Sequence, residues 1–186
     1  SLAKLADIFL VAPASADVIG KIANGIADDM LTTTIMACKC PKLISPAMNT
    51  NMFTNPIVQD NLKKLEHYGY EIIQPDSGYL ACGDTGAGKM PSEQVLLNYI
   101  LRTIAKDKDM TGIKLTVTAG PTREKLDPVR FLSNNSTGKM GYAIAKMAML
   151  RGADVTLISG KVSLEPVPFV KMVDIVSAED MYNAVI

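Results

Sequence analysis

A thiol and a run of glycines lie where they could act on a substrate. Residues 81–90 (ACGDTGAGKM) place three glycines within six residues and carry Cys82 and Lys89. So much glycine is costly in backbone entropy unless the chain must hinge or approach another group closely. A loop that closes over a substrate could exclude water, with Cys82 acting as an acid or a nucleophile and Lys89 meeting a phosphate. The alternative is a flexible surface loop with an incidental thiol, and the loop position of this cysteine favours a functional role.

Amide side chains form a second candidate site. Residues 46–53 (PAMNTNMF) follow a short apolar run, and they place Asn49 and Asn51 among Met48, Met52 and Phe53. Ligands bind outside the carboxyl ends of the strands in open α/β sheets, and a carboxamide there can donate a hydrogen bond to a carboxylate. An asparagine-rich turn with apolar anchors explains the pattern equally well.

A strand-to-helix turn forms the third segment. Residues 12–17 (APASAD) pass from an apolar run through small residues to Ser15 and Asp17, either of which can cap a helix. The first amides of that helix can bind an anion or the polar edge of a ring. An ordinary helix cap is the alternative interpretation.

The fourth segment covers residues 118–141 (TAGPTREKLDPVRFLSNNSTGKMG). A strand runs into a glycine turn, and a hydroxyl-rich turn then opens a helix, which together predict a phosphate or acyl-phosphate cradle. The connection between this strand and the helix has about twenty residues, whereas strand-to-helix loops typically have ~2–6 residues. It is not a Walker A loop, because Ser133 stands where the first glycine belongs and Met140 follows Lys139.

Short apolar runs that alternate with stretches of helical period predict repeated βα units, and so an α/β fold with parallel sheets. We expect strands at residues 7–12, 42–45, 70–73, 114–118, 153–159 and 173–176. We expect helices through 18–23 and 30–35, over 56–68 with Ile57, Leu62 and Leu65 inward, from 91 to 104, over 138–151 and from 179. Residues 77–89 are expected to form a loop. The polar segment 106–112 suggests a boundary between domains 1–110 and 111–186, the second of which stops after only three strands.

Composition excludes several classes of protein. Nineteen basic residues balance nineteen acidic ones, whereas a nucleic-acid binder normally has a basic excess. The longest apolar stretch, residues 8–14, is far shorter than the ~20 residues that cross a bilayer, so we expect a cytoplasmic protein without a membrane partner. Three cysteines argue against a disulfide framework, and Cys38, Cys40 and His67 do not make a zinc set. We expect the two cysteines to be apolar fillers and His67 to lie on the surface.

In this order, the four segments resemble the bacterial bifunctional phosphopantothenoylcysteine decarboxylase/phosphopantothenate–cysteine ligase family over essentially the whole chain. Residues 46–53 match its PxMNxxMW-type motif with Phe53 in place of tryptophan, and residues 12–17 match its flavin-contacting turn with Asp17 in place of asparagine. Residues 81–90 match its substrate-recognition clamp, and residues 119–141 are similar to the opening of its ligase. The resemblance implies a flavodoxin-like parallel-sheet domain followed by the start of a Rossmann-like doubly wound domain.

For the first domain, the resemblance implies FMN-dependent decarboxylation of 4′-phosphopantothenoylcysteine to 4′-phosphopantetheine, in which the flavin oxidises the substrate cysteine before its carboxylate leaves. Asn49 would hold that carboxylate, and Cys82 would donate the proton in the final reduction. The flavin would contact Ala14, Ser15, Asp17 and Met48. The substrate would also contact Met52, Gly83, Asp84, Gly86, Gly88, Lys89 and Met90.

For the second domain, the resemblance implies a ligase in which CTP, with Mg²⁺, activates 4′-phosphopantothenate as an acyl-cytidylate that the amine of cysteine attacks. Asn134 would stabilise this intermediate. The phosphate and substrate contacts would be Gly120, Ser136, Thr137, Gly138 and Lys139.

The resemblance further implies trimeric or higher self-association, and family elements before Ser1 and after Ile186. We therefore expect these 186 residues alone to turn over poorly. A stand-alone decarboxylase of peptidyl-cysteine is one alternative, against which the ligase-like segment speaks. A non-catalytic regulatory subunit on the same scaffold is the other, and in it Asn49 and Cys82 would be expendable.

Overall fold

The computed structural model describes residues 2–79 and 85–186, so the predictions for Cys82, Gly83 and Asp84 lie outside the described residues. The chain divides into two compact units, Ser1–Ile104 and Ala105–Ile186. Within the described residues, the longest helices have twelve residues, and no helix is both long and apolar enough to cross a membrane.

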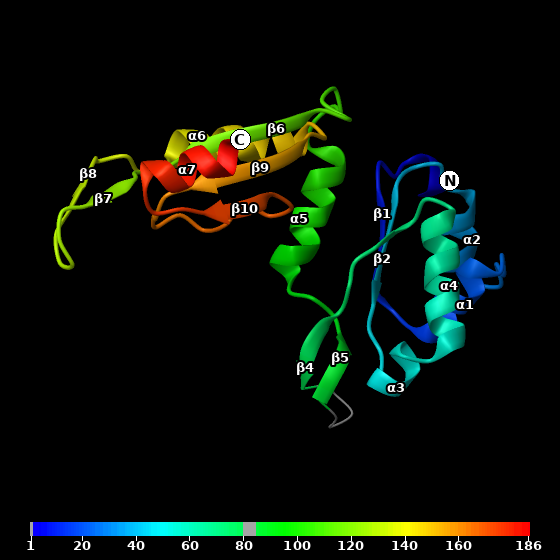
Figure 1. Cartoon of the computed structure of the whole chain (residues 1–186). Helices are drawn as coiled ribbons and strands as arrows, with labels where there is room; N and C mark the ends of the chain where they lie inside the picture. The colour runs from blue at the N-terminus through cyan, green and yellow to red at the C-terminus, as the bar shows by residue number, and fades with distance from the viewer. Residues whose placement is uncertain (1, 80–84) are drawn as a thin grey trace. The chain divides into compact units, whose positions relative to one another are not determined.

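The first unit is built around a three-stranded sheet (Figure 1). Its elements are, in chain order, η1 Leu2–Lys4, β1 Phe9–Ala14, α1 Ala16–Ala23, α2 Met30–Ala37, β2 Lys42–Pro46, α3 Thr50–Phe53, α4 Pro56–His67, β3 Glu71–Ile72, β4 Asp76–Tyr79, β5 Thr85–Lys89 and α5 Glu93–Ile104. The strand order is β1-β2-β3, and both pairings are parallel. The predicted parallel α/β fold is confirmed.

Helices cover both faces of this sheet. Successive side chains of a strand point to opposite faces, and β2 shows this with Ile44 and Leu43. Ile44 packs in a core cluster with Leu65 of α4, while Leu43 packs with Ile73 and with Leu96 of α5. The sheet is therefore an inner layer, with α1 and α4 on one side and α5 on the other.

Strand β1 continues farther than the sequence predicted. We expected it to end before Pro13, yet it runs through Pro13 to Ala14, and its register with β2 shifts between Val11 and Ala14. Proline has no amide hydrogen to donate to a ladder, and such an irregularity is where a strand accommodates it.

Local signals placed the helix starts correctly. Ser15 caps α1 by accepting from the amide of Val18 at 3.3 Å. Asp29 caps α2 in a capping box with Thr32. Helix α4 forms as expected, but its predicted inward face is partly wrong, since Ile57 is 72% exposed. Val58 packs on the core in its place, because positions 58, 62 and 65 form one stripe at helical spacing.

The glycine-rich segment is not the loop that we expected. Strands β4 and β5 pair antiparallel, with Ser77 opposite Ala87 and Gly78 opposite Gly86. The alternation of apolar residues that predicts strands is lacking here. Backbone pairing therefore organises this segment.

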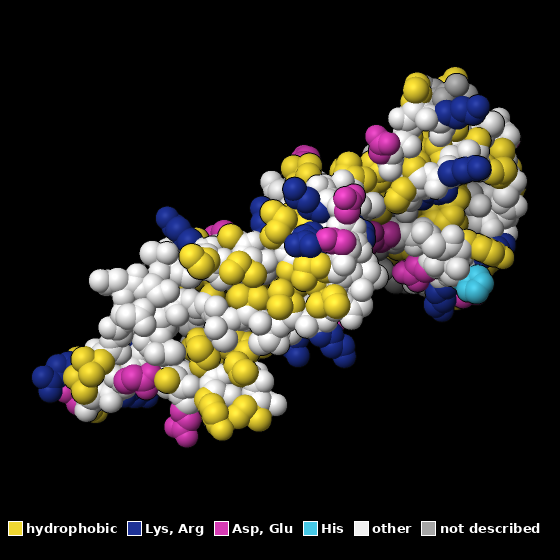
Figure 2. Space-filling model, turned by 90° about the horizontal axis from the view of Figure 1, so that it is seen from above, with side chains coloured by type: hydrophobic (Ala, Val, Ile, Leu, Met, Phe, Trp, Pro, Cys, Tyr) yellow, Lys and Arg dark blue, Asp and Glu magenta, His cyan; other side chains and the backbone are white. Residues whose placement is uncertain are grey.

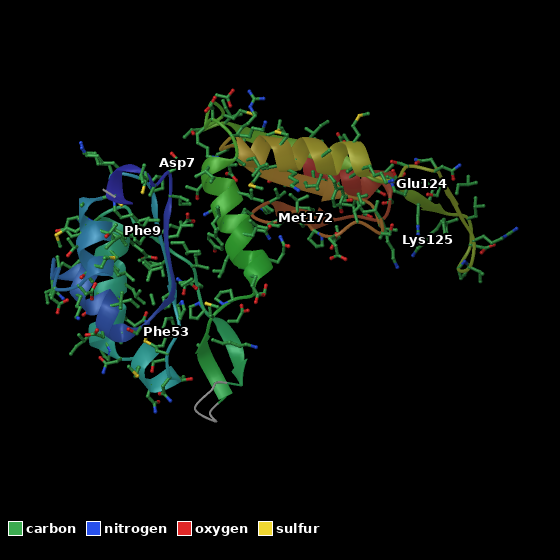
Figure 3. The ribbon with its side chains drawn as sticks, turned by 180° about the vertical axis from the view of Figure 1, so that it is seen from behind. Asp7, Phe9, Phe53, Glu124, Lys125 and Met172 are labelled. Atoms are coloured by element: carbon green, nitrogen blue, oxygen red, sulfur yellow. The ribbon has the colours of Figure 1, made fainter. Side chains whose placement is uncertain are left out.

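The second unit has the parallel strand order β10-β9-β6, with α6 packed on β6 and β9. Its elements are β6 Lys114–Ala119, β7 Arg123–Lys125, β8 Phe131–Ser133, α6 Lys139–Leu150, β9 Asp154–Ser159, β10 Lys171–Asp174 and α7 Ala178–Val185. The β7–β8 hairpin was missed, since we took this segment as one long connection. Glu124 and Lys125 of β7 are labelled in Figure 3.

Helix α6 forms where it was expected, but it buries other residues than the apolar ones that predicted it. Its buried side chains are Ala145, Ala148 and Met149, whereas Ile144 and Met147 are exposed. The helix is apolar on several sides, so periodicity does not select one face. Small alanines face the sheet, and a Cβ on Gly141 would lie 2.6 Å from that of Ala119.

Candidate functional site

The first candidate site lies where β1 and β2 end. Ala14 pairs with Pro46 in the parallel register, and the amide of Ala47 donates to the Ala14 carbonyl oxygen at 3.0 Å. The segments 12–17 and 46–53, which are separate in the sequence, thus meet at one edge of the sheet. This edge is where α/β sheets bind ligands.

Asn49 has a fixed orientation at this edge. It is half-buried at the N-cap of α3, and its Oδ1 accepts from the amide of Asn51 at 2.8 Å. The acceptor end of the carboxamide is thus engaged within the turn. The Nδ2 end is the donor, which is the end that suits a carboxylate.

Strand β5 lies directly against the Asn49 turn. The amide of Met48 donates to the Gly88 carbonyl oxygen at 3.0 Å. Gly88 has φ +135°, and a Cβ there would lie 2.2 Å from the Met48 carbonyl oxygen. Only glycine permits this approach. Strand β5 is therefore anchored beside Asn49.

Other predicted residues of the first site have varied surroundings. Met48 is half-buried and packs on the core, as does Phe53 of α3 (Figure 3). Met52 is 47% exposed. Met90 packs in the cluster of Leu43, Ile73 and Leu96, so its side chain contributes to the core.

The remaining predicted contacts of this site are polar. Asp17 is exposed in the first turn of α1 and pairs with Lys21 at 3.6 Å. Lys89 is exposed on β5, opposite Asp76. Both charged side chains are exposed, whereas Asn49 is half-buried.

Two hydroxyl groups of this site were not predicted from the sequence. Ser45 Oγ and Thr50 Oγ1 are buried and have no hydrogen-bond partner among the described residues. They lie at the end of β2 and at the start of α3, on either side of Met48 and Asn49. Buried hydroxyls are normally paired, so a polar ligand at these strand ends fits the donor set. No feature of the sequence distinguishes them from other hydroxyls.

An apolar cavity lies elsewhere in the first unit. It measures about 750 Å³ and is lined by Leu5, Ala6, Ile8, Phe9, Leu10, Met30, Leu31 and Thr34. Residues 8–10 are at the start of β1, so this cavity lies at the opposite end of the strand from Asn49. Its size does not make it the functional site, because it gathers none of the polar groups described above.

Cys38 and His67 have the surroundings that we expected. Cys38 is buried, its Sγ lies 3.6 Å from the Ala3 carbonyl oxygen, and burial raises the pKa of its thiol. Cys40 is half-buried, and His67 is exposed in the last turn of α4. The interpretation of Cys38 as a buried filler is confirmed.

The second candidate site is a cavity of about 380 Å³ in the second unit. It gathers five of the residues that the sequence predicted, namely Gly120, Ser136, Thr137, Gly138 and Lys139. Gly138 is the N-cap of α6 with φ +74°, and no side chain caps the helix. The first amides of a twelve-residue helix thus face a cavity that carries hydroxyl groups and a lysine, which suits an anion.

Asn134 is not among the residues that line this cavity. It is exposed, and its Oδ1 accepts from the amide of Ser136 at 2.9 Å. The asparagine therefore shapes the turn that supplies the cavity's hydroxyl groups.

A hydrogen-bonded pair of polar side chains in the second unit was also not predicted from the sequence. Tyr142 donates to Ser159 Oγ at 3.2 Å, and Ser159, which is 2% exposed, donates to the Gly160 carbonyl oxygen at 2.8 Å. Both side chains line a further cavity of about 420 Å³ at the ends of β9 and β10. The Ser–Gly pair after a predicted strand was the available signal.

Two protein families match the chain in succession. The family model described as Flavoprotein matches residues 1–105, and the DNA/pantothenate metabolism flavoprotein C-terminal domain matches residues 110–186. The chain is 48% identical over 184 residues to the coenzyme A biosynthesis bifunctional protein CoaBC of Bacillus subtilis, covering 97% of this chain and 45% of that protein. It is 46% identical to the protein of the same name from Escherichia coli K12, covering 99% and 45%. The chain thus spans less than half the length of these relatives.

Solved structures resemble the first unit. A PPC decarboxylase mutant complexed with pantothenoylaminoethenethiol has a TM-score of 0.52 and 38% identity, covering 53% of this chain and 56% of that one. The FMN binding protein AtHal3 has a TM-score of 0.50 and 37% identity, covering 56% and 58%.

Proposed function

Because the chain belongs to the flavoprotein family over residues 1–105, we propose that it is part of a bifunctional protein of coenzyme A biosynthesis. In this proposal the first unit decarboxylates 4′-phosphopantothenoylcysteine with FMN, and the second begins a CTP-dependent ligase that joins 4′-phosphopantothenate to cysteine. The names of the bifunctional relatives support this pairing of activities on one chain. The match of a second family from residue 110 speaks against a stand-alone decarboxylase.

One observation carries the first assignment: the hydrogen bond of 3.0 Å from the Met48 amide to the Gly88 carbonyl oxygen. It joins the Asn49 turn to the strand that follows Cys82. This bond supports the proposal that an amide donor for a carboxylate and the thiol of Cys82 act in one site.

The residues of this site suit FMN and its substrate. The amides that begin α1 after Ser15 would meet the polar edge of a ring, and Met48 would supply an apolar flank. The side chain of Ala14 is buried in the core, so it would support this turn from behind. FMN supplies the electron acceptor that the cysteine thiol of the substrate needs before its carboxylate can leave. Asn49 Nδ2 would donate to that carboxylate, oriented by the bond from Asn51 to its Oδ1.

The hairpin would act as the cover of the site. Held by Gly88, it excludes water from the reacting carboxylate, and water exclusion strengthens the hydrogen bonds inside. Cys82, which lies outside the described residues, remains our prediction for the proton donor in the last step.

In the second unit, the amides that begin α6, together with Ser136, Thr137 and Lys139, would bind phosphate groups of CTP or of phosphopantothenate. Asn134 would support the acyl-cytidylate through the turn that it stabilises. The residues that line this cavity include no carboxylate, so Mg²⁺ would be carried by the CTP phosphates.

We also propose self-association into trimers or larger assemblies. Large apolar side chains remain exposed on the described units (Figure 2), among them Leu5 at 79%, Met30 at 76% and Met140 at 78%. Such residues are costly to leave in water and are common at subunit interfaces.

The experiment uses the full-length protein. We expect flavin absorbance bands after purification, and coenzyme-pathway turnover with phosphopantothenate, cysteine and CTP. Cys82→Ser should stall the reaction at the reduction step while ligation continues. A colourless protein that turns over neither reaction would contradict the assignment, and an active Cys82→Ser variant would remove the thiol from it.

A further inference from the structure

We propose that Thr50 and Gly86 form a size-matched seat that sets the position of the β4–β5 hairpin over the Asn49 turn. The inference rests on the proposed function, because this position of the hairpin matters only if the substrate carboxylate binds at Asn49. Both are positioning residues in this account. Gly86 would thus act through the fit of the hairpin, and not through contact with the substrate.

The contact is tight on both sides. A Cβ on Gly86 would lie 2.5 Å from Thr50 Oγ1 and 3.0 Å from Thr50 Cγ2. Gly86 has no left-handed backbone conformation that would itself require glycine, in contrast to Gly88 with φ +135°. Space, and not backbone geometry, therefore excludes a side chain at position 86.

Thr50 is fixed in turn by its place in the fold. It is the first residue of α3, directly after Asn49. Its Oγ1 is buried and has no hydrogen-bond partner among the described residues. The γ-oxygen and the γ-methyl group of Thr50 are the atoms nearest to a Cβ at Gly86, so the shape of this side chain is what β5 lies against.

The hairpin itself provides the comparison. Gly78 is directly opposite Gly86 in the antiparallel register. Within the described part of the chain, a Cβ on Gly78 would meet only Lys89 Cδ, at the ordinary distance of 3.7 Å. The two glycines share a strand pair and differ in what they face, so the close packing is specific to the side that meets Thr50.

A methyl group at position 86 would therefore lift β5 from the Asn49 turn. The first bond to weaken would be the one from the Met48 amide to the Gly88 carbonyl oxygen, two residues along the same strand. Substrate turnover would fall because the cover no longer closes on Asn49. Flavin binding, which we assign to the ends of β1 and β2, would persist.

The test compares four variants of the full-length flavoprotein: Gly86→Ala, Gly78→Ala, Thr50→Ala, and the double variant of Gly86→Ala with Thr50→Ala. The hydrogen-exchange rate of the Met48 amide reports whether β5 keeps its position against the Asn49 turn, and this measurement does not require enzymatic activity. We expect Gly86→Ala to speed this exchange about tenfold and to lower kcat/KM for decarboxylation by a similar factor, with flavin content retained. Gly78→Ala should match the wild type within about twofold. The double variant should recover most of the Met48 protection, because Thr50→Ala removes both atoms nearest to the new methyl.

If Gly86→Ala showed the same Met48 exchange rate and kcat/KM as Gly78→Ala, the proposal would be overturned. It would also be overturned if the Met48 amide exchanged as fast in the double variant as in Gly86→Ala. Thr50→Val adds a measurement that does not depend on a clash. It keeps the β-branched shape of Thr50 and replaces its hydroxyl group by a methyl group, so Met48 exchange should stay within about twofold of the wild type, and faster exchange would show that the hydroxyl, not the shape, sets the position. A wild-type protein without decarboxylase activity would sink the proposed function alone, since the exchange pattern still tests the seat.

Discussion

The two candidate sites both lie at the ends of parallel strands, but they are built in different ways. In the first unit, two segments about forty residues apart in sequence meet through a backbone hydrogen bond and the close approach of Gly88 to Met48. In the second, the cavity is lined by a glycine turn and by the start of α6, where a Cβ on Gly138 would meet Val162 Cγ1 at 3.0 Å. The first contact involves backbone atoms, and the second a side chain that can move.

This difference predicts how well each site tolerates an added methyl group. A backbone carbonyl cannot move aside without shifting its whole turn, so any added methyl at Gly88 must separate β5 from Asn49. Val162 can adjust its side chain, so the start of α6 tolerates a methyl group at Gly138 more readily. The Gly88 contact depends on an exact fit between backbone segments, as does Gly120 in the second site, where a Cβ would lie 2.9 Å from the Gly160 carbonyl oxygen, whereas the Gly138 position depends on helix amides and a side chain that can move.

The largest effect is expected from Gly88→Ala. The new Cβ would overlap the Met48 carbonyl oxygen, and the residue would keep φ +135°. We expect a loss of at least about 2 kcal/mol in the free energy of unfolding, measured by denaturant titration, and a fall in decarboxylation of about tenfold or more. Gly69→Ala is the matched control, since Gly69 has φ +83° and nothing within 4 Å. If the two variants lose equal stability, backbone strain alone explains the glycine and the close approach does not matter.

A smaller effect is expected from Gly138→Ala. Backbone strain at φ +74° and a contact that Val162 can relieve should cost about 1 kcal/mol in the binding of CTP, or about a fivefold rise in its KM. Gly112→Ala, at φ +81° with nothing within 4 Å, should leave this KM unchanged. A rise as large for the control, or a collapse of the fold in Gly138→Ala, would contradict the tolerance that we assign to the second site.

The smallest effect concerns the turn of the β7–β8 hairpin. Asp127 Oδ1 accepts from the amides of Arg130 at 2.7 Å and Val129 at 2.9 Å, and these bonds with the Arg130 guanidinium lower the pKa of the carboxyl. Because the pKa of Asp127 is lowered by folding, its ionised carboxylate stabilises the turn fully above the unfolded-state pKa of about 3.9. This stabilisation is lost as the pH falls through the pKa of the folded state. Amide exchange at positions 129 and 130, corrected for intrinsic rates, should therefore become less protected below about pH 4.

Asp127→Asn provides the control for this pH dependence. The amide side chain can still accept from both backbone groups but does not titrate in this range. Protection in this variant should thus be independent of pH. An equal loss of protection in the variant and the wild type would assign the effect to another group.

Much of the fold could be predicted because its signals are local. Ser15 and Asp29 cap the helices that follow them, and the apolar runs of β2 and β9 lie inside their sheets. The grouping of Gly120 with Gly138 and Lys139 was also predictable, because each flanks a strand end or a helix start.

The rest depended on contacts that sequence patterns do not report. Strand β5 (TGAGK) has no apolar alternation, and its place is set by Met48 and Thr50 from a distant turn. Ile57 was expected inside on hydrophobicity alone, but the stripe through Val58 took its place. The importance of Thr50 could not be predicted, since its role follows only from the glycine that faces it.

The most direct test of the account compares Asn49→Ala with Asn55→Ala in the full-length protein. Both asparagines cap a helix, and the side chain of each accepts a hydrogen bond from the amide two residues ahead, at 2.8 Å and 2.9 Å. Only Asn49 lies beside β5. We predict that Asn49→Ala lowers kcat/KM for phosphopantothenoylcysteine by about 10- to 100-fold, the loss expected for a hydrogen bond to a charged group, while Asn55→Ala stays within about twofold. Equal activity in the two variants would contradict the claim that the Asn49 turn and the hairpin form one catalytic site.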